Sequence, residues 1–393
     1  MAPVVSRSEP ALAALLLAVQ LLCACTAGPI IPMPSGGQAA LPGRILREAN
    51  QGIPLDSAEE TALLFVAEYH LLSQAIGVEL WPGWSAEKIR YAIKVGPDRW
   101  LLVNHYDPLP GMDWVMQEIV PYPVFIGSLG MDPAGQGNLP IRGRMTLVLS
   151  LKLGEAAMVR EEIIGLLFQL SAHQTMGIAC ALQHGTRLSA PPLIPPAPDQ
   201  RALRRAEMRL LSRALDAGDD AGCLQEAARY KAVREARRKA CNPELYAFEQ
   251  RMEATEGIAL YIRLRALELA CQCAQAGRKS LLAENVGAVA LYQKYEGILH
   301  THCIQKLEQT ASQGYGAGSY GFHITGMAMA CLLDRLDPGW KKQLMKKPEG
   351  SMESLLFDMV GMQDSADQQE RFMEACDICD FQRLVEEERR SVF

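Results

Sequence analysis

Two polar side chains interrupt an apolar helical segment near the middle of the chain. Gln169 and His173 are four residues apart, so a helix places them on one face, one turn from each other. A histidine in such a position is either a hydrogen-bonded core residue or a metal ligand, and by itself the first interpretation is the more common. A metal site therefore requires partners from elsewhere in the chain.

A second unusual segment lies in the long helix predicted for residues 244–274. It reads TEGIALY over residues 255–261. Glu249, Glu253 and Glu256 share one face, which is typical of a solvated stripe. Gly257 needs a separate reason, because a glycine inside a helix costs about 1 kcal/mol relative to alanine. Close approach of another helix or a metal site would supply that reason.

Together the two segments resemble the metal centre of gluzincin-type zinc metallopeptidases of the HExxH…E class, in particular exported bacterial proteins. In that family one helix carries HExxH, with two histidine ligands and a catalytic glutamate. A later helix supplies a glutamate ligand from a segment such as NEGxAxY. The TEGIALY segment is similar to the later motif, and Glu256 falls at its ligand position. The resemblance implies that the helices carrying His173 and Glu256 pack together near Gly257.

The first motif departs from the family pattern. The segment LLFQLSAH, residues 166–173, resembles an HExxH helix in which Gln169 replaces the first histidine and Leu170 replaces the general base. Catalytic zinc takes three protein ligands plus a water whose pKa it lowers to about 7. The amide of Gln169 is a weak donor, and without a carboxylate at position 170 a factor of ~10²–10⁴ in rate is lost. We expect no working peptidase; zinc is the only candidate cofactor, with His173, Glu256 and Gln169 as its ligands.

Three functional interpretations follow. The first is an exported zincin-like protein with a degenerate centre, retained as a non-catalytic binding or envelope-associated module whose partner is an envelope or extracellular protein or peptide. The alternative is an active zinc-dependent peptidase or hydrolase that recruits His184, His323 or Glu253 as a substitute ligand or base. The third is an unrelated helical envelope protein with accidental matches.

Other reactive residues give weaker signals. His300 and His302 are two positions apart, so they face apart on a helix and cannot chelate one ion together; Cys303 and Cys331 are soft ligands that could lie near them. The CxxC spacing of residues 376–379 occurs in an acidic helix without a neighbouring strand, which argues against a redox role. The glycine-rich segment 314–321 has no strand before it and no phosphate-binding lysine, so we interpret it as a loop or lid.

The predicted elements that must position these residues fall into two groups. Before residue 154 we expect a helix over 57–77, a hairpin formed by 89–95 and 100–105, and strands at 114–119, 124–126 and 145–153. The later part reads as helices at 155–182, 200–216, 222–240, 244–274, 286–310 and 324–336, followed by acidic terminal helices. This order predicts an α+β, zincin-like fold with a small mixed or antiparallel N-terminal sheet and a predominantly helical C-terminal part.

The N-terminus reads as an export signal. Arg7 precedes the apolar residues 11–22, and small residues follow up to Ala27. Simple cleavage after Ala27 and lipidation at Cys25, in the lipobox-like LCAC of residues 22–25, are alternatives. We expect a periplasmic, outer-membrane lipoprotein or secreted location, and membrane association only through a lipid anchor at Cys25.

The remaining boundaries follow from composition. After the signal at 1–27 we expect a Pro/Gly-rich tether over 28–56, a zincin-like helix, sheet and motif helix over 57–185, a Pro-rich linker and charged helical hairpin inserted at 186–241, and a helical subdomain over 242–393. The hairpin pattern is typical of solvated helices. A net charge of −6 over 393 residues argues against a nucleic-acid-binding protein.

Overall fold

The computed structural model describes residues 55–106, 109–115, 117–129, 137–151, 160–184, 196–275, 292–313, 320–346, 351–361 and 365–391. The predicted export signal, with Cys25, and nearly all of the tether lie outside these residues. Contacts divide the chain into two compact units, residues 1–73 with 85–164 and residues 74–84 with 165–393.

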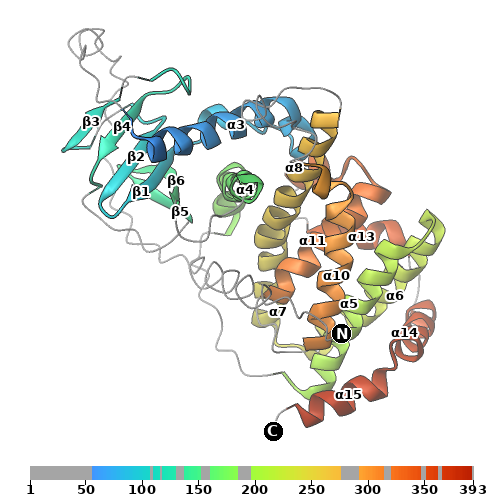
Figure 1. The fold of residues 1–393 in the computed structure, drawn as a ribbon. Helices are drawn as coiled ribbons and strands as arrows, with labels where there is room; N and C mark the ends of the chain where they lie inside the picture. Colours follow the sequence, from blue (N-terminus) through green and yellow to red (C-terminus); the bar gives the residue numbers. More distant parts are fainter. Residues whose placement is uncertain are drawn as a thin grey trace, which may run out of the picture. The chain divides into compact units, whose positions relative to one another are not determined.

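The first unit contains a mixed β-sheet (Figure 1). Its described strands are β1 (Tyr91–Gly96), β2 (Arg99–Val103), β3 (Met112–Trp114), β4 (Val124–Gly127), β5 (Gly137–Ile141) and β6 (Arg144–Ser150). They lie in the order β3-β4-β2-β1-β6-β5. All neighbouring strands are antiparallel except β1 and β6, which are parallel. The α+β prediction and the β1–β2 hairpin are thus confirmed.

Alternating side chains give the sheet two apolar faces. One face carries a buried cluster: Ala92, Trp100, Leu102, Met112, Phe125, Leu129, Ile141 and Val148. On the other face, Tyr91 meets Tyr69 of helix α3 (Ser57–Leu80) edge to face, with ring centroids 6.2 Å apart. Polar contacts reinforce this packing, because Tyr122 Oη lies 2.7 Å from His70 Nδ1. Burial on both faces explains why these strands read as short, nearly continuous apolar runs.

One predicted strand has different bounds in the structure, and one strand was not predicted. The strand expected over 114–119 ends at Trp114, and its described part begins at Met112. Strand β5 was not expected at all, because Pro140 and Gly137 are unfavourable strand residues. Its position at the edge of the sheet resolves this conflict, since an edge strand tolerates a residue that lacks an N–H donor.

The second unit is helical. Its elements are α5 (Pro198–Asp216), α6 (Asp220–Ala240), α7 (Pro243–Met252), the π-helical segment η2 (Glu253–Gly257), α8 (Ile258–Gln275), η4 (Gln293–Tyr295), α10 (Ile298–Gln313), α11 (Tyr320–Leu336), α12 (Trp340–Lys346), α13 (Met352–Val360), α14 (Ser365–Cys379) and α15 (Phe381–Arg390). Helix α11 packs against α5, α8, α10, α13 and η2, which makes it the central element of this unit (Figure 1).

The division between the units differs from the predicted domain boundaries. It falls inside helix α4 (Arg160–His184), between Ile164 and Gly165. Gln169 and His173 therefore belong to the helical unit, whereas a 57–185 domain would have grouped them with the sheet. The end of α3 belongs there too, because Lys341 Nζ lies 3.3 Å from the carbonyl oxygen of Glu79 and donates to it.

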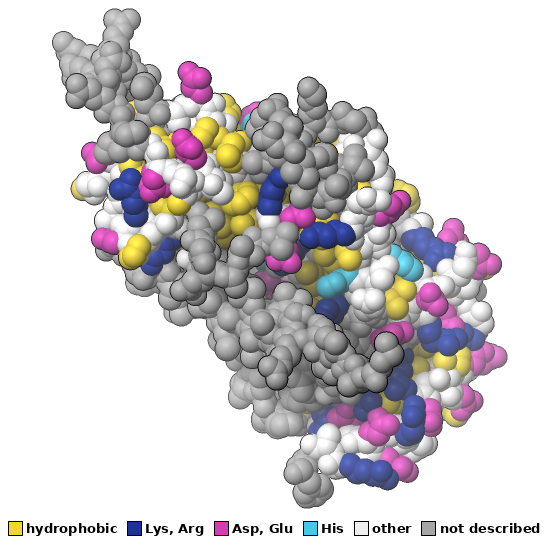
Figure 2. Space-filling view, in the orientation of Figure 1, with side chains coloured by type: hydrophobic (Ala, Val, Ile, Leu, Met, Phe, Trp, Pro, Cys, Tyr) yellow, Lys and Arg dark blue, Asp and Glu magenta, His cyan; other side chains and the backbone are white. Residues whose placement is uncertain are grey.

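The expectation of a solvated hairpin over α5 and α6 was wrong. Twelve residues of α5 are buried, and α10 and α15 pack on it while α14 packs on α6. The arginines are buried because they find carboxylates: Arg234 and Arg237 are 1% and 3% exposed. Local composition could not reveal this, because the partners lie on other helices. On the face shown in Figure 2, the remaining basic and acidic side chains are interspersed over the region of α14 and α15.

Helix α3 is, within the described residues, the one helix long and apolar enough to cross a membrane by length and composition. Its most apolar window has a mean hydropathy of 1.3, and 67% of that window is buried. A core helix of a soluble protein satisfies the same two criteria, so this observation is weak support for a membrane span.

Candidate functional site

The structure brings His173 and Glu256 together in the helical unit. His173 Nε2 of α4 lies 3.4 Å from Glu256 Oε2 of η2, and the two side chains are 22% and 16% exposed. Residues 83 positions apart in the sequence thus meet as an ion pair at a partly buried site. The two motif segments therefore lie close together, as predicted. Their side chains contact each other directly, whereas two ligands of one metal ion would each contact the ion.

The backbone around Glu256 explains how this side chain reaches its position. Residues 253–257 form a π-helical turn between α7 and α8, and such turns occur mostly as single insertions into α-helices. Gly257 lies against Gly326 of α11: a Cβ atom at Gly257 would be only 2.5 Å from Gly326 Cα. Close approach of a helix is thus the reason for this glycine. The approaching helix is α11, whereas we had expected the helix that carries His173.

Electrostatics favour the charged forms of both partners. Burial lowers the pKa of His173, but the charge and hydrogen bond of Glu256 outweigh it, and the net pKa is raised. For Glu256 burial raises the pKa, while His173 and, more weakly, His323 lower it to about 2. A protonated imidazole has no lone pair for a metal. The pairing with Glu256 thus favours the protonated form of His173, in which the imidazole offers no lone pair to a metal.

The other two predicted site residues contribute no ligand here. Gln169 Oε1 lies 3.4 Å from Arg263 Nη1 and accepts a weak hydrogen bond, so a second cation adjoins Gln169. Leu170, at the general-base position, is 4% exposed and belongs to the apolar core. A guanidinium beside the amide opposes a metal cation at this point.

The substitute ligands proposed from the sequence have different outcomes. Glu253 is unavailable, because Oε2 accepts from Arg234 Nη2 at 2.7 Å and Oε1 from Thr325 Oγ1 at 2.9 Å. The side chain of His184 lies outside the described side chains. The pKa of His323 of α11 is lowered, mainly by burial. Glu256 and His173 lie close enough to contribute smaller opposing effects, since Glu256 raises this pKa and His173 lowers it. Within the described residues, His323 Nε2 is buried without a hydrogen-bond partner.

These residues do not fit a zinc centre. Among the side chains that the structure describes, no group of three or more His, Cys, Asp or Glu residues could hold a metal ion. His300 and His302 confirm the spacing argument: His300 Nε2 lies 3.0 Å from the carbonyl oxygen of Leu215, whereas His302 is near Arg263, and burial together with two cations lowers its pKa to about 4. The glycine-rich loop falls outside the described residues up to 319.

A buried charge network beside the site was not expected. Arg234 and Arg237 of α6 contact four buried carboxylates on four other elements: Glu207, Glu249, Glu253 and Glu353. The two shortest of these contacts, both 2.6 Å, join Arg237 Nε to Glu207 Oε1 and Arg237 Nη2 to Glu249 Oε2. The three glutamates predicted to form a solvated stripe therefore divide between two sites, since Glu249 and Glu253 enter this network and Glu256 pairs with His173.

The network fixes the position of η2 and so of Glu256. Arg204 of α5 also contacts Glu249, at 3.3 Å, giving three arginines and four glutamates. Burial first, and then the neighbouring carboxylates Glu353 and Glu249, raise the pKa of Glu253 to about 7 despite the opposing charge of Arg234. If Glu253 were protonated, the network would contain three arginine cations and three glutamate anions. In the sequence the only signal was the arginine-rich helix, whose partners are distant.

Searches with family models, among curated proteins and among solved structures found no match.

Proposed function

We propose that this chain is an exported zincin-like protein whose metal centre has been replaced by an ion pair, and that it acts as a non-catalytic binding or envelope-associated module. The pairing of His173 with Glu256 carries this proposal. These are the two ligand positions of the gluzincin pattern that retain suitable residues, and they meet in space although the chain between them is long. Two cations, the imidazolium and Arg263, adjoin the position that a metal would take.

The replacement of ligands gives a direct test. Gln169→His places a second imidazole one turn from His173, on the face that adjoins Glu256, and so restores the His/His/Glu set. We expect metal-stripped Gln169→His to bind zinc more tightly than wild type in calorimetry. Arg263 places a second cation beside this position, and like charges repel, so Gln169→His combined with Arg263→Gln should bind more tightly still.

The control for this test uses a neighbouring helix position. Gln174→His adds an imidazole to the same helix but on another face, so it should not change zinc affinity. Adding Leu170→Glu would supply the general base, but position 170 is buried, and the single substitution is the cleaner measurement. Equal weak zinc binding by wild type and Gln169→His would contradict the zincin assignment.

A second candidate function is a zinc-dependent hydrolase in which His323 supplies the missing ligand. It is favoured by one observation, the buried and unpartnered Nε2 of His323 near the ion pair. Stoichiometric zinc in wild type, with peptide hydrolysis that His323→Ala abolishes, would support this candidate against the non-catalytic one. Retained zinc binding in His323→Ala would exclude His323 as the ligand.

A further inference from the structure

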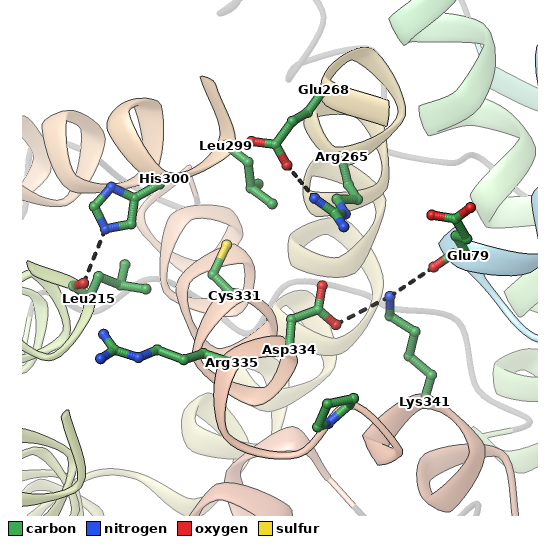
Figure 3. A pocket seen from close by; sticks show the side chains of 11 residues that line it. Glu79, Leu215, Arg265, Glu268, Leu299, His300, Cys331, Asp334, Arg335 and Lys341 are labelled. Carbon is green, nitrogen blue, oxygen red and sulfur yellow. Dashed lines mark hydrogen bonds and ion pairs between the residues drawn. The ribbon is translucent and has the colours of Figure 1, made fainter. Parts of the chain in front are cut away.

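The helical unit contains a cavity that does not include the ion pair described above. Its volume is about 510 Å³, within the range of ~300–1,000 Å³ typical of small-molecule sites. Figure 3 shows side chains of α8, α10 and α11 around it, together with Glu79 at the end of α3 and Lys341 of α12. Neither His173 nor Glu256 lines the cavity, so a ligand bound here is a function beyond the one proposed above.

Several charged groups in the walls of this cavity are already engaged with protein partners. Lys341 Nζ donates a hydrogen bond to Tyr261 Oη at 2.7 Å and lies 3.2 Å from Asp334 Oδ1. On another wall, Arg335 Nε donates to Asp220 Oδ1 at 2.9 Å. Lys341, Asp334 and Arg335 are therefore structural parts of the walls, because a ligand could bind them only by displacing an existing partner.

Two groups of opposite charge stay open to a ligand. Within the described residues, the carboxylate of Glu79 has no hydrogen-bond or ion-pair partner, and only its backbone carbonyl is engaged. Arg265 has one partner there, Glu268, although a guanidinium carries more N–H donors than one carboxylate occupies. Both side chains are accessible, since Glu79 is exposed and that of Arg265 is 29% exposed. In Figure 3 the two charged groups lie at the same end of the cavity.

Apolar side chains form a further part of the walls. Leu215 of α5, Leu299 of α10 and Pro338, which follows α11, all line the cavity. An aliphatic group that leaves water to contact them gains free energy in proportion to the apolar area buried. A cavity with one open carboxylate, one partly open guanidinium and apolar neighbours therefore matches a molecule that carries an ammonium group, a carboxylate and an aliphatic group.

We propose that this cavity binds a free α-amino acid with an aliphatic side chain. The ammonium group of the ligand pairs with Glu79, its carboxylate pairs with Arg265, and its side chain contacts Leu215 and Leu299. Hydrogen bonds between charged partners are the strong ones, and in this arrangement each charge of the ligand meets an opposite charge. In a longer peptide the terminal ammonium and carboxylate groups lie on different residues, so a free amino acid suits two partners at one end of the cavity.

Three probes that share one aliphatic group test this assignment on the full chain. L-Leucine carries both charges, L-leucinamide lacks the carboxylate, and 4-methylpentanoate lacks the ammonium group. Calorimetric titration is done at pH ~6, where the ammonium and carboxylate groups are charged. We expect leucine to bind more tightly than either of the other probes, because each of those forms only one of the two ion pairs. The proposal is overturned if leucine does not bind or if the three probes bind equally.

Two substitutions assign each charge of the ligand to its partner. Glu79→Gln should weaken binding of leucine and leucinamide about two- to five-fold, as expected for one exposed charge pair, and should leave 4-methylpentanoate unchanged. Arg265→Gln should weaken leucine and 4-methylpentanoate to a similar extent, and leucinamide should bind no more weakly than before. The matched controls Glu244→Gln and Arg383→Gln replace exposed residues that do not line the cavity and should change nothing. A cavity variant that behaves like its control, or that weakens all three probes alike, would also overturn the proposal.

Discussion

The contact between Gly257 and Gly326 gives the sharpest prediction for stability. A Cβ added at Gly257 would lie 2.5 Å from Gly326 Cα, and a Cβ at Gly326 would lie 2.3 Å from the carbonyl oxygen of Glu253. Both obstacles are backbone atoms, so no side-chain rotation can relieve them. Alanine at either position must push η2 and α11 apart.

The magnitude follows from two opposing effects. Overpacking of a tight interior costs about 1–3 kcal/mol, and rigid backbone obstacles place Gly257→Ala at the upper end of that range. Alanine regains up to about 1 kcal/mol of helix propensity. We therefore expect a net loss of about 2 kcal/mol in the free energy of unfolding. At ~2–4 °C per kcal/mol for a unit of this size, Tm should fall by about 4–8 °C.

Two other glycines calibrate the measurement by urea and thermal denaturation. Gly218→Ala places its Cβ in open space and should be neutral or stabilising by up to ~1 kcal/mol. Gly165→Ala meets only side-chain atoms, Leu267 Cδ1 at 3.1 Å and Arg263 Cγ at 3.2 Å, so its effect should be intermediate. The double variant Gly257→Ala with Gly326→Ala should lose less than the sum of the single losses, because both act on one contact. If Gly257→Ala behaves like Gly218→Ala, the close approach of η2 and α11 is refuted.

Three further predictions concern the charge network and the N-terminus. Arg234→Met should destabilise the chain by about 3–5 kcal/mol in urea denaturation, because it leaves buried carboxylates without their partner; an equal effect from the exposed Arg383→Met would argue against this. Glu253 has a folded-state pKa of about 7, above its ordinary value of 4.5, so wild type should lose stability as pH rises from about 4.5 to about 7. Glu253→Gln should remove this part of the pH dependence, and an unchanged Tm profile would show that Glu253 stays ionised. Intact-mass spectrometry of protein from its native host should find a mature N-terminus at or near Cys25 or Gly28, and an uncleaved chain beginning at Met1 would contradict export.

Much of the secondary structure followed from local patterns. The capping residues Asn242 and Asp219 accept backbone hydrogen bonds at the starts of α7 and α6, because capping depends on a few consecutive residues. The continuous helix predicted over 244–274 is interrupted by the π-helical turn at Glu253–Gly257, and a single turn of this kind is too short to be recognised from apolar periodicity. The hairpin of β1 and β2 could also be predicted, because two short apolar runs and the turn between them are local in the sequence. Edge strand β5 could not be predicted in this way.

The sequence by itself determined which residues could do chemistry and which could not. Through its resemblance to the HExxH…E pattern it indicated His173 and Glu256 as candidate ligands and predicted that Gln169 and Leu170 would not support a peptidase, because donor strength and basicity are properties of single side chains. Gly257, by its type alone, indicated either the close approach of another helix or a metal site.

Only the tertiary structure decided what surrounds these groups. It made His173 and Glu256 an ion pair, placed Arg263 beside Gln169, and showed that α11, not α4, approaches Gly257. It also showed that the charged helices α5 and α6, which we had expected to be solvated, bury arginines such as Arg234 and Arg237. The physical reason is the same in each case: the pKa of a group and the free energy of burying it depend on partners that are distant in the sequence and meet only when the helices pack.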